Sequence, residues 1–278
     1  MFGAAHRFSL GRFDILVVKD GIEGRTPLHA FVVSIPAELA RQTVYMLGGL
    51  TVIDTPDRRI LIDAGNPPWK RGRTHVASTV LGRLGVAPET VDRVLITHGD
   101  LDHVGGLLTS NGRLTYPNAR LTMHRALWRS WQRPTGQRAN ARPGSNPPDG
   151  LTDLLQGRVD CFEEEQEVLP EIHALPLPGH RVGHTGFRIV SGGETLFHIG
   201  DAAFDPIFLE RPSLANDRDT NPAVAAETRA CLVKRAIAER ALVVGSHFRL
   251  PATGRLVPAP HGARWVSVGH PAADPGPQ

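Results

Sequence analysis

A short segment near the middle of the chain carries four side chains that can bind a cation. Within T-H-G-D-L-D-H-V-G-G, two imidazoles and two carboxylates lie in six consecutive residues: His98, Asp100, Asp102 and His103. Placing these groups on one tight loop is costly unless something positive binds them. A divalent metal ion is the simplest such partner, because zinc accepts both histidine nitrogen and carboxylate oxygen. The segment therefore predicts part of a metal site whose remaining ligands lie elsewhere in the chain.

Three further metal-capable side chains share one sequence context. His180, Asp201 and His247 each follow a short apolar run typical of a strand, and each lies beside or close to a glycine. A lone histidine at a strand end is most often structural, but this joint pattern is hard to obtain by chance. Because functional residues gather where strand ends converge, we expect these three side chains to meet the first cluster.

Short apolar runs separated by turns predict a β-rich chain with few helices. Helical spacing predicts helices over residues 74–84 and 223–239, and a short helix or arm at 35–40. Strands that end in metal-capable residues and alternate with helices indicate a β-sandwich flanked by helices. The expected strands cover residues 13–18, 44–47, 50–54, 59–65, 94–97, 119–123, 172–177, 187–190, 195–199 and 241–244.

We expect one domain over residues 1–278, because a chain of 278 residues can bury a substantial core. Residues 128–150 are rich in Pro, Gly, Asn and Arg, which predicts a flexible lid or loop at an active site. Residues 268–278 are expected to form a disordered tail. An arm around residues 22–42 is a candidate contact for a homodimer.

The overall composition excludes several classes of protein. With 41% hydrophobic and 21% charged residues, the chain is typical of an ordinary globular protein. The net charge is +3 without a dense Lys/Arg run, so we expect a small-molecule substrate and no nucleic-acid partner. No window approaches the length of about 18 apolar residues that a membrane span needs. Cys161 and Cys231 lack a metal or disulfide spacing, and a cytoplasmic location is expected.

The order of these motifs resembles that of the metallo-β-lactamase-fold hydrolase superfamily. Its signature is His-x-His-x-Asp-His, followed downstream by His, Asp and His. The resemblance extends from the strand before Asp63 to His247. It implies an α+β fold, namely an αβ/βα four-layer sandwich in which two mixed β-sheets pack face to face with helices on the outer faces. It also implies a site for two divalent metal ions at one edge.

The resemblance assigns a ligand set to each of the two metal ions. His98, Asp100 and His180 would hold one ion, whereas Asp102, His103 and His247 would hold the other, with Asp201 bridging the two. Two neighbouring residues would orient ligands or pack against them without binding metal. These are Asp63 in L-I-D-A-G and His184 in P-G-H-x-x-G-H.

Asp100 departs from the signature, because the family pattern has histidine at this position. A carboxylate is a legitimate ligand, so an altered site is expected here. Three carboxylates would offset more of the charge of two divalent ions than two would. Zinc remains the expected metal, but manganese and iron become more competitive.

The sequence G-S-H-F-R-L-P-A-T-G at residues 245–254 is similar to a stretch in the branch of N-acyl homoserine lactone lactonases and methyl parathion hydrolase-like enzymes. This implies a metal-dependent hydrolase that opens an ester or lactone of a small molecule with a metal-bridged hydroxide. Asp102 is the candidate catalytic residue that carries a proton, and Phe204 and Phe248 are candidates for a substrate pocket. Alternatives on the same fold are an iron-dependent sulfur dioxygenase, a glyoxalase II-like thioester enzyme, a phosphodiesterase and a binding protein with a decayed site.

Overall fold

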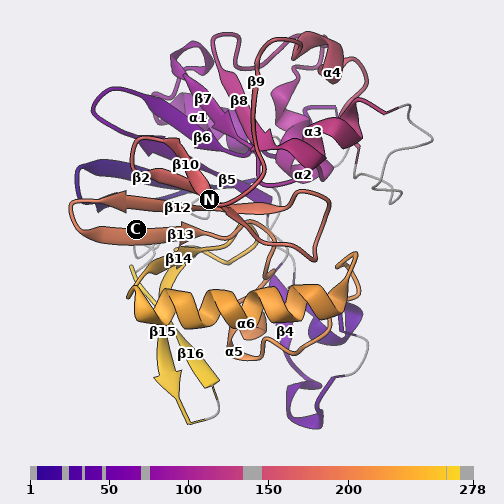
Figure 1. Cartoon of the computed structure of the whole chain (residues 1–278), viewed down its shortest axis with the longest axis vertical. Helices are drawn as coiled ribbons and strands as arrows, with labels where there is room; N and C mark the ends of the chain where they lie inside the picture. Colours follow the sequence, from indigo (N-terminus) through magenta and orange to yellow (C-terminus); the bar gives the residue numbers. More distant parts are fainter. Residues whose placement is uncertain are drawn as a thin grey trace, which may run out of the picture.

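Two β-sheets packed face to face form the centre of the molecule (Figure 1). The computed structural model describes residues 5–20, 25–32, 35–45, 48–69, 76–133, 146–260 and 262–269. Within these residues each large sheet has seven strands, and a third sheet has two. Helices cover the outer side of both large sheets, so the layers run helix, sheet, sheet, helix. This arrangement confirms the predicted α+β four-layer sandwich.

The first sheet belongs to the N-terminal half of the chain. Strand β2, which lies next to the edge strand β1, carries the apolar run Ile15–Val18 because both of its faces are covered. Ile15 and Val17 belong to the core between the sheets, whereas Leu16 and Val18 pack on the helix side. In sheet order the strands are β1 (Ala5–Leu10), β2 (Phe13–Asp20), β5 (Gly48–Asp54), β6 (Arg59–Ile62), β7 (Arg93–Leu95), β8 (Arg120–His124) and β9 (Val159–Phe162).

The second sheet belongs to the C-terminal half. Its strands pair antiparallel except for β13 and β14, which are parallel and are connected through the long helix α6 (Pro222–Ala238). That helix begins at Asn221, whose side chain accepts a hydrogen bond from the Val224 amide, and at Pro222, which suits a first helical turn. In sheet order the strands are β10 (Gln166–Leu169), β11 (Ile172–Pro176), β12 (Thr185–Ser191), β13 (Glu194–His198), β14 (Leu242–Val244), β15 (Thr253–Ala259) and β16 (Gly262–Ser267).

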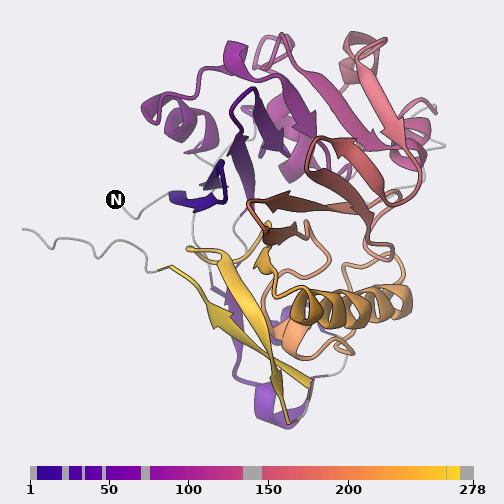
Figure 2. The same ribbon diagram turned by 60° about the vertical axis from the view of Figure 1, so that its left-hand side comes forward.

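The remaining elements are short. The hairpin of β3 (Arg25–Pro27) and β4 (Thr43–Tyr45) extends toward the same end of the molecule as β15 and β16 (Figure 2). Among the described residues, none of the helices combines the length and apolar character of a membrane span. The other α-helices are α1 (Val76–Arg83), α2 (Leu101–Val104), α3 (Arg125–Trp131), α4 (Leu151–Leu154) and α5 (Ile207–Glu210), and the 3-10 turns are Leu28–Ala30, Ala37–Leu39, Pro88–Thr90 and Gly105–Leu107.

The structure differs from the predicted elements at several boundaries. Helix α3 extends into the predicted lid as far as Trp131, and His124 Nδ1 caps the start of the helix by accepting a hydrogen bond from the Ala126 amide. Residues 134–145 of that lid, residues 46–47 of a predicted strand and residues 270–278 of the tail lie outside the described residues. The segment of four metal-capable residues, expected to be a loop, includes the short helix α2.

Candidate metal centre

All seven predicted ligands meet at one edge of the two sheets. They form three overlapping groups whose ligand atoms lie within 4.8 Å of one another. The first sheet contributes the segment that follows β7 and runs into α2, whereas the second contributes the segments after β11, β13 and β14. From the first sheet come His98, Asp100, Asp102 and His103, and from the second come His180, Asp201 and His247.

The donor atoms at the first of two candidate ion positions include Asp100. Asp100 Oδ2 lies 3.7 Å from Nε2 of His98 and 3.7 Å from Nε2 of His180. Asp201 Oδ2 closes this group, at 3.7 Å from His98 Nε2 and 3.6 Å from His180 Nε2. Two imidazole nitrogens and two carboxylate oxygens therefore surround one position, a donor set that suits a divalent cation.

The donor atoms at the second candidate ion position include Asp102. Asp102 Oδ2 lies 4.0 Å from His103 Nε2 and 3.8 Å from His247 Nε2. Asp201 approaches the same two rings, with Oδ1 at 3.3 Å from His103 Nε2 and Oδ2 at 2.9 Å from His247 Nε2. Asp201 thus lies between the two groups, where a bridging ligand would be.

The histidine rings are oriented so that one nitrogen points into the centre. His103 Nδ1 donates to Asp63 Oδ2 over 2.7 Å, and His98 Nδ1 lies 3.0 Å from Thr97 Oγ1. His180 Nδ1 donates to Asp219 Oδ1 over 3.0 Å. These contacts use the Nδ1 atoms and leave Nε2 of each ring for a ligand.

Four buried polar atoms at the centre lack a hydrogen-bond partner within the described part of the chain. They are Nε2 of His98, His103 and His180, together with Oδ1 of Asp201. Buried polar atoms are rarely left without a partner, so several at one point indicate a site for a ligand such as a metal ion. A pair of divalent cations fits these atoms, because imidazole nitrogen and carboxylate oxygen are ligands that such ions accept.

The electrostatics of the group agree with this assignment. Burial alone would raise the pKa of Asp201, yet the facing imidazoles of His247, His103 and His98 lower it well below the ordinary value. Burial would lower the pKa of His103, but Asp201 and Asp63 raise it well above normal. The metal-free cluster therefore favours protons at the position that a cation would take.

Asp63 forms hydrogen bonds with Thr97 and His103, near the two ends of the first metal-capable segment. Its φ of 62° ends strand β6 and turns the carboxylate back toward the Thr97–His103 segment. Asp63 Oδ1 accepts the Thr97 amide over 2.8 Å, and Oδ2 accepts the Thr97 hydroxyl over 2.8 Å. With the bond from His103 Nδ1, both oxygens of the Asp63 carboxylate accept hydrogen bonds.

His180 depends on close packing of its turn against helix α6. Gly179 has a φ of 122°, and a Cβ at this position would lie 2.4 Å from the Ala225 amide nitrogen. Only glycine fits this approach. Behind the ring, Asp219 also accepts a bond from Arg229 Nη1 over 3.0 Å, and both side chains are 1% exposed.

Asp100 has a partner that the sequence prediction missed. Arg181 Nε donates to Asp100 Oδ1 over 2.9 Å, and Arg181 Nη2 lies 2.8 Å from Asp100 Oδ2. Burial would raise the pKa of Asp100, but His180, His98 and Arg181 lower it far below the usual range. Asp100 is therefore a carboxylate paired with an arginine.

His184 lies beside the candidate ligands, but both of its ring nitrogens are used. Its Nε2 accepts the Asp201 amide over 3.0 Å, and its Nδ1 donates to the Leu177 carbonyl over 2.8 Å. Burial lowers the pKa of His184 well below normal, which keeps the ring neutral. His184 therefore supports the backbone of Asp201 and has no nitrogen left for a metal.

The two predicted pocket residues lie in different places. Phe204 is 3% exposed and packs edge-on against His180 and His247, with ring centroids 5.4 Å and 5.0 Å away. Phe248 is 1% exposed and lies against Trp265, with ring centroids 5.3 Å apart. The Phe204 ring therefore contacts the candidate ligands directly, whereas Phe248 packs toward β16.

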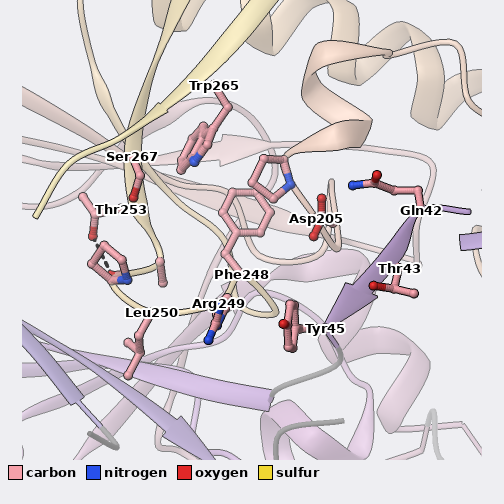
Figure 3. Close-up of a pocket in the computed structure, with 13 residues that line it drawn as sticks. Gln42, Thr43, Tyr45, Asp205, Phe248, Arg249, Leu250, Thr253, Trp265 and Ser267 are labelled. Atoms are coloured by element: carbon pink, nitrogen blue, oxygen red, sulfur yellow. Dashed lines mark hydrogen bonds between the residues drawn. The ribbon is translucent and has the colours of Figure 1, made fainter. Parts of the chain in front are cut away.

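A cavity of about 310 Å³ lies beside the His247 segment (Figure 3). Its walls combine strand β4, the segment after His247 and strand β16. Tyr45 and Arg249 pack together on one side, with the guanidinium 4.9 Å from the ring centroid. The other named side chains in Figure 3 include Gln42, Asp205, Phe248 and Trp265.

Sequence reasoning missed several buried partners of the ligands. Arg181 follows His180 directly, so its position was the only available hint. Asp219 and Arg229 lie far from their partners along the chain and carry no motif. Lys19 on β2 is also buried and donates to the Ser246 carbonyl over 2.8 Å, next to His247. Burial lowers the pKa of Lys19 to about 7.

Comparisons with known proteins agree with this geometry. A curated relative, "Probable metallo-hydrolase Rv2300c" of Mycobacterium tuberculosis, is 23% identical over 185 residues. The match covers 58% of this chain and 58% of that protein. A relative from Mycobacterium bovis, "Probable metallo-hydrolase Mb2322c", matches to the same extent.

Solved structures share the fold over nearly the whole chain. AidC, a dizinc quorum-quenching lactonase in complex with a product, has a TM-score of 0.81 at 20% identity, covering 96% of this chain and 98% of AidC. The hydrolase AbOPH has a TM-score of 0.80 at 20% identity, covering 97% and 99%. A Bacillus thuringiensis AiiA mutant with bound N-decanoyl-L-homoserine has a TM-score of 0.63 at 15% identity, covering 87% and 94%.

The family profile spans the segments that carry the candidate ligands. The profile of the metallo-beta-lactamase superfamily matches residues 50–247, which include strand β6 directly before Asp63 and end at His247. The fold, the clustered donor atoms and this match agree, and the chain belongs to the metallo-beta-lactamase superfamily.

Proposed function

We propose that this protein is a metal-dependent hydrolase that opens an ester or lactone bond of a small molecule. The observation that carries the proposal is the pair of donor groups joined by Asp201, with buried Nε2 atoms that lack partners. Two divalent ions bound there would supply an activated water at neutral pH and a Lewis acid for a carbonyl oxygen. Zinc is the proposed metal, because its ligands are histidine nitrogen and carboxylate oxygen.

Lactones and esters are favoured as substrates by the structural relatives. AidC, named with a bound product, and an AiiA mutant, named with bound N-decanoyl-L-homoserine, share the fold of this chain. The chain also holds an apolar ring at the centre, since Phe204 packs against His180 and His247. We propose that Phe204 forms an apolar wall beside the reacting carbonyl.

Asp102 is proposed to move the proton during hydrolysis. Its side chain is 30% exposed, compared with 15% for Asp100 and 3% for Asp201, so it is the candidate carboxylate ligand most open to a substrate. Burial would raise the pKa of Asp102, but His103 and His247 lower it, which keeps it ionised. An ionised carboxylate at this position can accept a proton from water and return it to the leaving alcohol.

The test is hydrolysis by the full chain after metal loading. We expect the zinc-loaded protein to open N-hexanoyl homoserine lactone or to cleave an aryl ester, and the metal-free protein to lose this activity. Asp102→Asn should lower kcat by about 10²- to 10⁴-fold. Asp57→Asn, which changes an exposed carboxylate in a surface turn, is the matched control and should retain activity.

Failure in these assays has a defined meaning. The zinc-loaded protein could hydrolyse neither lactones nor aryl esters but cleave a thioester or phosphodiester. That result would replace the proposed substrate class with the one that is cleaved. A protein that binds metal and cleaves none of these bonds would overturn the proposed hydrolase activity itself.

A further inference from the structure

The Asp100–Arg181 pair is more buried, and makes more hydrogen bonds, than an ordinary ion pair at a protein surface. The side chains are 15% and 7% exposed. Arg181 Nη1 also donates to the His180 carbonyl over 2.9 Å and to the Arg218 carbonyl over 2.6 Å. With the two contacts to Asp100, the guanidinium is held by both backbone and carboxylate. Such a planar fork fixes the orientation of a carboxylate as well as neutralising it.

In this fixed orientation the two carboxylate oxygens of Asp100 have different contacts. Oδ1 accepts Arg181 Nε, whereas Oδ2, which contacts Nη2, also faces His98 Nε2 and His180 Nε2 at 3.7 Å each. Asp100 precedes α2, yet its side chain does not cap that helix, so Arg181 is its main orienting contact. Only one oxygen of Asp100 is therefore presented to an ion between the two histidines.

We propose that Arg181 is a specificity-determining residue that restricts Asp100 to a single ligand oxygen and thereby favours zinc over manganese in this half of the centre. The inference rests on the proposed metal centre and adds a choice of metal to it. A carboxylate that binds through one oxygen suits the four-coordinate geometry of zinc. A carboxylate free to bind through both oxygens suits harder ions such as manganese, which accept more oxygen ligands.

Arg181 also neutralises part of the negative charge at the centre, and this acts on zinc and manganese alike. Asp100, Asp102 and Asp201 place three carboxylates around the centre, and Arg181 offsets one of these charges. From the sequence alone, the added carboxylate of Asp100 was expected to make manganese and iron more competitive. The Asp100–Arg181 pair opposes that tendency, because it presents only one oxygen of Asp100 to an ion.

The test is the ratio of zinc to manganese affinity, measured on the metal-free full chain by competition with a chromophoric chelator. Removing a positive charge strengthens the binding of any divalent cation, and this common gain cancels in the ratio. We expect Arg181→Gln to shift the ratio toward manganese by about tenfold or more. Arg181→Lys retains the charge but cannot hold both oxygens, so it should shift the ratio in the same direction.

Arg188→Gln is the matched control. It breaks another arginine–carboxylate pair, with Glu239 on the far side of the second sheet, and should leave the ratio unchanged. An unchanged ratio in both Arg181 variants would overturn the inference, and so would a shift in Arg181→Gln that Arg181→Lys does not share. These outcomes leave the proposed hydrolysis standing, whereas a wild-type chain that binds neither metal would overturn the proposed function.

Discussion

Asp63 is the residue on which the geometry of the first cluster most depends. It holds the backbone and hydroxyl of Thr97 and the Nδ1 atom of His103 at the same time. The Thr97 hydroxyl in turn lies 3.0 Å from His98 Nδ1. One carboxylate therefore sets the ring orientation of His103 directly and of His98 through Thr97.

We predict that Asp63→Asn weakens metal binding without unfolding the protein. The amide retains the size of the side chain but removes the negative charge that makes His103 a strong ligand. The affinity for zinc should fall by about 10- to 100-fold, as measured by chelator competition on the metal-free chain. Circular dichroism checks the fold, and an affinity equal to that of the wild type would contradict this role.

At the scale of elements, helix α6 supports the centre from behind. Arg229 on α6 is 1% exposed and pairs with Asp219, which orients His180. The same guanidinium donates to the Leu214 carbonyl over 2.8 Å and to the Pro212 carbonyl over 3.1 Å. Helix α6 thus connects the segment before it, through the Pro212 and Leu214 carbonyls, to Asp219 and the candidate ligand His180.

We predict that Arg229→Met destabilises the protein by about 3 to 5 kcal/mol, because it leaves the buried Asp219 carboxylate without its partner. The control is Arg235→Met on the same helix, whose pairs with Glu165 and Glu239 are partly exposed, at 33% for Arg235, 45% for Glu165 and 24% for Glu239. Exposed pairs contribute little, so this control should cost less than about 1 kcal/mol. Urea unfolding of the metal-free variants measures both values, and equal losses would contradict the prediction.

Features with a local sequence pattern could be predicted from the sequence, whereas contacts between distant segments could not. His98, Asp100, Asp102 and His103 lie in one segment, and the other ligands lie beside glycines at strand ends, so their types and order could be recognised. Asp219 approaches His180 only because the chain after α5 folds back on the turn at Gly179, a contact with no local pattern. Strands β15 and β16, which complete the second sheet, also went unpredicted, although they pair as a local hairpin.

At the scale of the whole molecule, the centre joins the two halves of the sandwich. Its ligands come from segments at the edges of both large sheets, so ions bound there would connect one sheet to the other. Without metal, three carboxylates face one another across a buried position. Metal binding should therefore stabilise the entire fold, beyond the site itself.

We predict that removing metal with a chelator lowers the melting temperature by roughly 10 °C. A ligand at about 1,000 times its Kd adds about 4 kcal/mol, and each kcal/mol shifts Tm by about 2–4 °C in a chain of this size. Differential scanning calorimetry of loaded and chelated protein measures the shift. A metal-independent Tm would contradict the assignment.

The same shift should depend on pH. In the metal-free cluster, facing carboxylates raise the pKa of His103 and of His180 despite their burial. Protons therefore compete with metal as the pH falls through these raised values, and they stabilise the metal-free fold there. The gain in Tm on metal binding should shrink toward low pH, and a gain that grows on acidification would contradict this account.

The most direct test of the account is the metal content of the purified full chain. After equilibration with zinc and removal of loosely bound ions, elemental analysis should find about two metal ions per chain, as a dinuclear hydrolytic centre requires. Metal content indistinguishable from that of the buffer would contradict the assignment of these seven residues to a metal centre.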